Sequence, residues 1–195
     1  MLYNSKLYIL LSLVFIVFCT RKPNTKASKE QPDDLNSLIT TLDTQEKKEQ
    51  FLAELYYNDQ DVRNKDRAHE ILKRNKYDMG SYEYQEYSDR RRYIDAINFD
   101  KAKKYLEVYG YPKFKPSTYR SISAFSLICM HQPTYQQQLE LFPYLYQAYR
   151  DSLITADNFS FLLNNMHRHK FGESHPHAIS NEENIIQLLE KLDLN

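Results

Sequence analysis

The sequence has little glycine and no excess of either charge. Only 3 of its 195 residues are glycine, which disfavours folds rich in tight turns, such as β-sandwiches, and favours helices. The 26 basic and 26 acidic residues give a formal net charge of zero. Because dedicated nucleic-acid binders usually carry a basic excess, we expect no nucleic-acid partner.

The sequence also lacks the common signatures of enzymes. It contains no glycine-rich phosphate loop, nucleophile elbow, CxxC pair or HExxH helix, and it predicts no cofactor. Its two cysteines are Cys19 and Cys129. Cys129 lies in the apolar run 124–130, where a free cysteine usually behaves as a small buried hydrophobic residue, so we expect no disulfide.

One long apolar run is present, at residues 7–18, which read LYILLSLVFIVF. It is shorter than the roughly 20 residues of a membrane span and fits the apolar core of a signal peptide. Cys19 follows at once, which resembles a bacterial lipoprotein signal cleaved before a lipidated cysteine, although Phe18 stands where that pattern has a small residue. Residues 1–19 are therefore predicted to be a signal peptide or an uncleaved anchor, with Cys19 as the lipidation site.

Residues 20–42 are predicted to form a flexible tether. The stretch 20–34 contains two prolines and many charged residues, so it cannot bury enough apolar surface to fold. A tether behind an anchor is the layout of an envelope protein. We therefore expect a protein of the bacterial cell envelope, held on the membrane by its N-terminus and facing away from the cytoplasm.

Residues 43–195 are predicted to form one all-α domain, an irregular bundle of about six helices, because apolar residues recur at three- and four-residue steps. The first helical stretch, 43–74, is one long helix or two in line. Helix starts are expected at Asp43, Asn98, Thr155 and Ser180. Gly110 is expected to stop a helix in the left-handed conformation.

The segment 119–130 is apolar almost all round in its second half, which predicts the central and most buried helix of the domain. Ser117 or Thr118 would begin this helix, and Pro133 would end it. The next apolar stripe contains Pro143, which predicts a kink or a split there.

Polar residues on apolar faces indicate where function lies. Asp59 falls on the apolar stripe of its helix, so its carboxylate needs a partner. Arg63 is one turn further on, and Gln60 is adjacent. His131 ends the helix expected to be most buried, where the helix dipole favours a charged imidazole. Asp59 and His131 are predicted to face each other across two packed helices.

This polar set has two interpretations. A buried Asp–Arg–His network often serves only to fix helix register. Alternatively it forms a catalytic or ligand-binding site, in which His131 is a general base, Asp59 orients it and Arg63 holds an anion. A pocket with these side chains at its floor would favour an enzyme, and a sealed interior would exclude one.

A histidine-rich segment near the C-terminus raises the question of a metal site. His167 and His169 are two residues apart near a helix end, where side chains two apart point to nearly opposite sides. His175 and His177 flank a proline in an extended stretch, so both rings could share a face and, with a third ligand, bind a metal. The simpler interpretation is a solvated loop that becomes charged at mildly acidic pH. We therefore predict no metal, with His175 and His177 as weak candidates.

The basic run 90–92 lies among tyrosines and could attract a phosphate or a nucleic acid. Glu83, Glu86 and Asp89 precede it and cancel most of its field. We therefore expect a solvated face held by ion pairs.

Several of these motifs together resemble a bacterial family, domain of unknown function 6624. The chain matches its D-Q-x-x-R motif at 59–63, its D-x-x-N motif at 95–98 and its Y-G-x-P motif at 109–112. The segment 130–143 is similar to its Q-H-A-D…Q…L-P stretch, and the resemblance covers roughly residues 50–177. It marks Gln60, Asn98 and Gln132 as candidate binding residues.

The chain departs from the family at 164–166, where a D-R pair is usual, and at 172–177, where G-x-x-Q-x-Y-G is usual. The family has no established activity, so the resemblance implies a fold and a site rather than a reaction. The sequence thus favours a membrane-tethered module that binds a protein or a small molecule. A hydrolase-like enzyme using Asp59, Arg63 and His131 is the alternative.

Overall fold

The computed structural model describes residues 32–113, 119–176 and 182–194, and these residues form helices without strands, which confirms the all-α prediction. The described residues belong to one unit that spans 31–195. Its elements in chain order are α1 (Pro32–Thr40), α2 (Gln45–Asp61), α3 (Lys65–Arg74), α4 (Tyr82–Tyr109), α5 (Tyr119–Met130), α6 (Tyr135–Arg150), α7 (Ala156–Phe171) and α8 (Glu182–Leu192).

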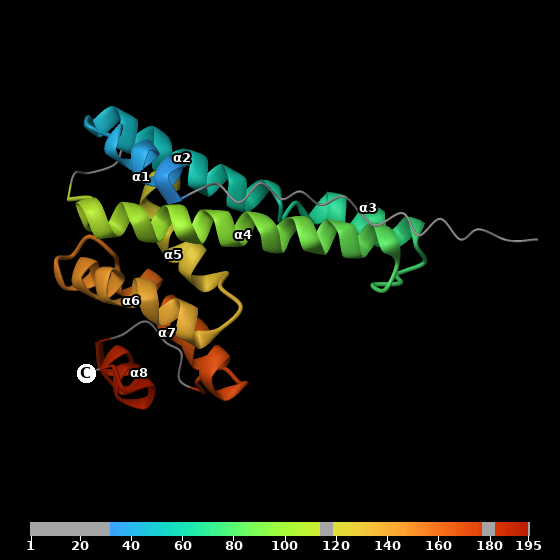
Figure 1. The fold of residues 1–195 in the computed structure, drawn as a ribbon. Helices are drawn as coiled ribbons and strands as arrows, with labels where there is room; N and C mark the ends of the chain where they lie inside the picture. The colour runs from blue at the N-terminus through green and yellow to red at the C-terminus, as the bar shows by residue number, and fades with distance from the viewer. Residues whose placement is uncertain (1–31, 114–118, 177–181, 195) are drawn as a thin grey trace, which may run out of the picture. The chain divides into compact units, whose positions relative to one another are not determined.

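The helices are arranged in two groups joined through α5. Helices α1, α2 and α3 pack along α4, while α6 packs on α7 and α7 packs on α8 (Figure 1). Helix α5 contacts α2, α4, α6 and α7, so it is the central helix that its apolar sequence predicts. The end of α5 therefore lies where both groups of helices meet.

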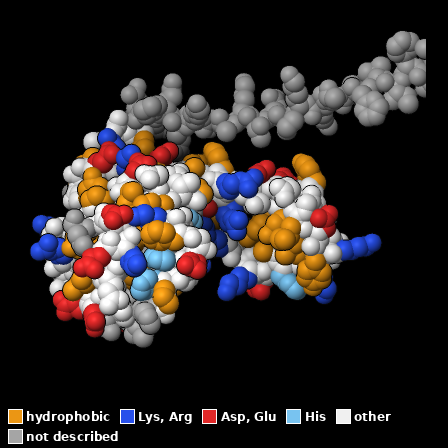
Figure 2. Space-filling model, turned by 90° about the horizontal axis from the view of Figure 1, so that it is seen from below, with side chains coloured by type: hydrophobic (Ala, Val, Ile, Leu, Met, Phe, Trp, Pro, Cys, Tyr) orange, Lys and Arg blue, Asp and Glu red, His pale blue; other side chains and the backbone are white. Residues whose placement is uncertain are grey.

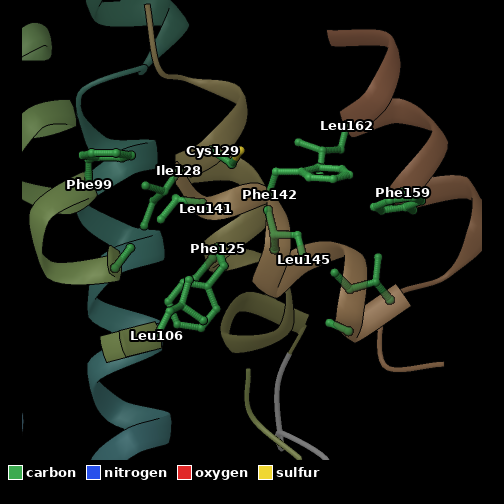
Figure 3. Packing of buried hydrophobic residues seen from close by; sticks show 14 of the residues in the cluster. Phe99, Leu106, Phe125, Ile128, Cys129, Leu141, Phe142, Leu145, Phe159 and Leu162 are labelled. Carbon is green, nitrogen blue, oxygen red and sulfur yellow. The ribbon is translucent and has the colours of Figure 1, made fainter. Parts of the chain in front are cut away.

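A continuous apolar core holds the two groups together. Phe125, Ile128 and Cys129 of α5 are fully buried between residues of α4 and of α6 (Figure 3). On the far side of α6, the ring of Phe159 stacks on that of Tyr149 with 4.3 Å between centroids. Burying each large apolar side chain contributes about 1.5–3 kcal/mol. The core thus fixes α5 against both of its neighbours.

Short polar side chains set the helix starts. Thr155 accepts a hydrogen bond from the backbone of Asn158, as predicted. The prediction for Asp43 is wrong by one residue, because Thr44 is the cap that accepts from Lys47. Asp43 instead forms an exposed ion pair with the Lys47 side chain. The expected caps at positions 117, 118 and 180 lie outside the described residues.

The expected helix start at Asn98 is also wrong. Helix α4 continues from Tyr82 to Tyr109 without interruption, and Asn98 is buried within it. The side-chain amide of Asn98 donates to the carbonyl of Leu55 at 3.4 Å, so it contacts α2 instead of starting a helix. By contrast, the stretch 43–74 divides into α2 and α3, because Asn64 caps a new helix by accepting from Arg67.

Two other special residues differ from expectation. Pro143 lies inside α6, which continues through it without the split that was one predicted outcome. Gly110 does end α4 with a positive φ of 67°, but its ψ of −170° is extended rather than left-handed helical. A second glycine, Gly172, ends α7 in the left-handed conformation, with φ 83° and ψ −7°.

The helical unit begins earlier than the sequence predicts. Helix α1 falls within the expected tether 20–42, and Ile39 and Leu42 are buried in the core. The hydroxyl of Tyr109 donates to the carbonyl of Ile39 at 2.8 Å, which holds α1 on the end of α4. The tether prediction is therefore too long at its C-terminal end. Within the described ranges, no helix is long and apolar enough to cross a bilayer.

Candidate functional site

The predicted polar site is assembled around Asp59 in the last turn of α2. Its side chain is only 2% exposed. The Nδ1–H of His131 donates to Oδ1 of Asp59 across 2.7 Å, although the two residues are 72 positions apart. The side-chain amide of Gln60 donates to Oδ2 at 2.7 Å. The prediction that Asp59 and His131 face each other is confirmed.

Arg63 links this carboxylate to α4. Its Nη1 lies 3.0 Å from Oδ1 of Asp59 and also donates to the Asp59 carbonyl at 3.0 Å. Its Nη2 donates to Oδ1 of Asp95 at 2.7 Å. One guanidinium therefore neutralises carboxylates from two helices and fixes the end of α2 against the middle of α4.

A cavity of about 460 Å³ opens beside this network. Arg63 and His131 line it, whereas Asp59 lies behind them. The walls come from α4, from the segment that leaves α5, from the first turn of α6 and from the end of α7. The described lining residues are Arg63, Arg91, Arg92, Asp95, Ala96, Met130, His131, Gln132, Pro133, Gln137 and His169.

The cavity wall is rich in basic side chains. Three arginines and two histidines line it, with Asp95 as the one carboxylate among the described lining residues. Figure 2 shows Lys and Arg side chains gathered in the hollow beside the projecting end formed by α3 and the start of α4. Arg92 is exposed and pairs with Asp89. Within the part of the chain that the structure describes, Arg91 has no ion-pair partner, although it is half-buried.

This geometry determines which nitrogen of His131 can act. An ionised carboxylate only accepts hydrogen bonds, so the proton of a neutral ring lies on Nδ1 toward Asp59. Nε2 is then an acceptor or base, and no described residue bonds it. The His131 side chain is 26% exposed and lines the cavity, so a ligand there can reach the ring. With a neutral ring the arrangement suits general-base chemistry, and with a doubly protonated ring it suits anion binding.

The other candidate binding residues differ in whether they line the cavity. Gln60 is exposed and bonds Asp59. Gln132 lines the cavity, but it is buried and its amide donates to the Ile128 carbonyl at 2.8 Å. Asn98 is not among the described lining residues. Its contact with α2 positions the helix that carries Asp59.

The histidine-rich segment differs from the expected solvated loop. His167 and His175 are buried, with ring centroids 5.3 Å apart. Nδ1 of His167 is 2.8 Å from the carbonyl of Glu173, and the backbone of His175 donates to Asn164. These contacts fold the segment back on α7, and the described residues contain no cluster of three or more potential metal ligands. His177 and the lipidation candidate Cys19 lie outside the described residues.

Sequence reasoning missed Arg91, Gln137 and His169 as site residues. The expectation of a solvated face for the run 90–92 holds for Arg92 and not for Arg91. Arg91 stands four residues before Asp95, which places both on one face of α4. This spacing alone predicts an ion pair between Arg91 and Asp95. In the structure Asp95 pairs with Arg63 instead, and the sequence does not show that contact.

No protein-family model, curated protein or solved structure matches this chain. The resemblance to domain of unknown function 6624 therefore stays a prediction.

Proposed function

We propose that the chain is a membrane-tethered binding module of the bacterial cell envelope whose cavity takes a small anionic molecule. The observation that carries the proposal is the convergence of Arg63, Arg91, Arg92 and His131 on one cavity. Arginine presents planar N–H donors that suit oxyanions, and these donors act more strongly when partly withdrawn from water.

The size and composition of the cavity support a small organic ligand. A volume of about 460 Å³ lies within the range of small-molecule sites. Ala96, Met130 and Pro133 add apolar surface to the wall. A ligand with an anionic group and an apolar body would match both parts.

A calorimetric titration of the full chain in nonionic detergent tests the proposal. Benzoate and phenyl phosphate serve as anionic probes, and benzyl alcohol is the neutral counterpart. We expect at least one anion to bind and the alcohol not to bind. Arg91→Gln should weaken binding about tenfold or more, equivalent to about 1.4 kcal/mol. Arg90→Gln is the matched control, because Arg90 is the exposed neighbour outside the described cavity lining. Failure of both anions to bind would refute the proposal.

The tethering part of the proposal rests on residues 1–19 and is tested separately. Cys19→Ser should release the protein from bacterial membranes, and the intact mass of the wild-type protein should show a lipidated, processed N-terminus. Unchanged fractionation of the variant together with an unprocessed mass would contradict lipidation.

A hydrolase is the second candidate, favoured by the Asp59–His131 hydrogen bond at the cavity. In this role Nε2 of His131 would take a proton from a water molecule as the water attacks the substrate. A substrate such as p-nitrophenyl phosphate or p-nitrophenyl acetate should then be cleaved. His131→Gln should lower the rate about 100-fold or more, while His69→Gln, on the exposed surface of α3, should not. Absence of any turnover, or equal rates in both variants, would eliminate this candidate.

A further inference from the structure

We infer that the anionic group recognised by the cavity is a terminal phosphate of an organic molecule, bound by Arg91, Arg92 and His131. The inference rests on the proposed anion-binding function and narrows its ligand class.

Among the described residues, Arg91 is the lining arginine that lacks a counter-ion. Arg63 is neutralised by Asp59 and Asp95, and Arg92 pairs with Asp89. The described residues offer Arg91 no such partner. Withdrawing a guanidinium from water without a counter-charge is unfavourable. A bound anion would supply the missing charge, so Arg91 marks where the ligand's anionic group lies.

The donors come from several directions. Arg91 and Arg92 extend from α4, Gln137 belongs to the first turn of α6, and His131, which follows α5, can donate from Nε2 when its ring carries a second proton. Donors on three segments can approach a ligand from different sides. A single planar guanidinium can satisfy both oxygens of a carboxylate, whereas a terminal phosphate has three oxygens in a tetrahedral arrangement. The cavity therefore suits a phosphate better than a carboxylate.

The cavity is also larger than a phosphate alone requires. Its volume of about 460 Å³ leaves room for an organic body against Ala96, Met130 and Pro133. These side chains offer apolar contact and no charge. The ligand class is thus a phosphate monoester, either free in solution or as the headgroup of a phosphatidic-acid-like lipid.

The test compares phenyl phosphate with benzoate, which share an aromatic body and differ in the anionic group. The full chain is titrated in nonionic detergent by calorimetry, and the phosphorus NMR signal of phenyl phosphate reports its binding directly. We expect phenyl phosphate to bind about tenfold or more tightly than benzoate. Arg91→Gln should remove most of this preference and Arg90→Gln should leave it unchanged. Arg91→Lys keeps the charge but loses the forked geometry, so it should lower phosphate affinity while circular dichroism shows intact helices.

The outcomes separate this inference from the proposed function. Benzoate binding as tightly as phenyl phosphate would overturn the phosphate assignment and leave the anion site standing. If neither anion binds, both the phosphate assignment and the proposed anion site are refuted. Short-chain phosphatidic acid, compared with phosphatidylcholine of equal chain length in the same detergent, distinguishes the two sources. Selective binding of phosphatidic acid that Arg91→Gln abolishes supports a lipid headgroup. Binding of phenyl phosphate alone supports a free phosphate ester.

Discussion

Replacing Asp59 by Asn should strongly destabilise the helical unit. The carboxylate is 2% exposed and its partner Arg63 is 19% exposed, so solvent screens their ion pair only weakly. Removing one member of a buried pair costs about 3–5 kcal/mol. Arg63 keeps Asp95 and the Asp59 carbonyl, and the Asn oxygen can still accept one hydrogen bond, so the lower end applies. We expect a loss of about 3 kcal/mol, or about 6–12 °C in Tm for a chain of this size.

Urea unfolding followed by far-ultraviolet circular dichroism measures this loss. Asp61→Asn is the matched control, because Asp61 is on the same helix, its side chain is 56% exposed and it pairs with Arg67 only at 3.4 Å. The control should change stability by about 0.5 kcal/mol or less. A double-mutant cycle of Asp59→Asn with Arg63→Met should give a coupling of about 1–3 kcal/mol. Equal effects of Asp59→Asn and Asp61→Asn would refute the reasoning that the network holds α2, α4 and α5 together.

Three further predictions concern the rest of the unit. Gly110→Ala should lower the free energy of unfolding in urea by about 1–3 kcal/mol, because the combination of φ 67° and ψ −170° at Gly110 is open essentially only to glycine. The loss should exceed that of Gly172→Ala, and a smaller loss would contradict this prediction. Burial raises the pKa of Tyr111 to about 12 and also raises the pKa of Tyr105. Folding therefore favours the neutral phenols, and their contribution is intact below the ordinary tyrosine pKa of 10.0 and is lost as pH rises toward 12. Tyrosinate absorbance should show a late ionisation step that coincides with helix loss, and ionisation of every tyrosine near the ordinary pKa with intact helices would argue against it. Burial also raises the pKa of the Cys129 thiol, so mass spectrometry should find Cys129 alkylated by iodoacetamide only after denaturation, and labelling of the folded chain would be inconsistent with this packing.

The sequence predicted those features of the fold and the site in which the spacing of apolar residues along a helix determines which side chains are buried. Asp59 and His131 were identified because each falls on an otherwise apolar helical face, and buried polar groups need partners. The apolar residues almost all round the second half of α5 identified it as the central helix. These features depend on helical periodicity, which a single sequence carries.

The sequence was less informative where tertiary contacts decide. Asn98 has the residue type of a helix cap, but its contact with Leu55 on another helix makes an internal position favourable. Two apolar residues, Ile39 and Leu42, do not make a periodic pattern that predicts a helix. They are nevertheless buried in the core that α4 and α5 form. Adjacent residues in a helix point about 100° apart. Both Arg91 and Arg92 line the cavity, but Arg92 also reaches Asp89, whereas Arg91 has no ion-pair partner among the described residues. Charge counting along the chain cannot separate these two residues.

The cavity joins parts of the chain that lie far apart, from Arg63 at the end of α2 to His169 in the last turn of α7. No contiguous fragment contains these walls without most of the helical unit. Occupancy is therefore thermodynamically linked to global folding, and a ligand at 100 times its Kd would raise the free energy of unfolding by about 2.7 kcal/mol. Ligand occupancy would also slow amide exchange in helices that never touch the ligand, including α8.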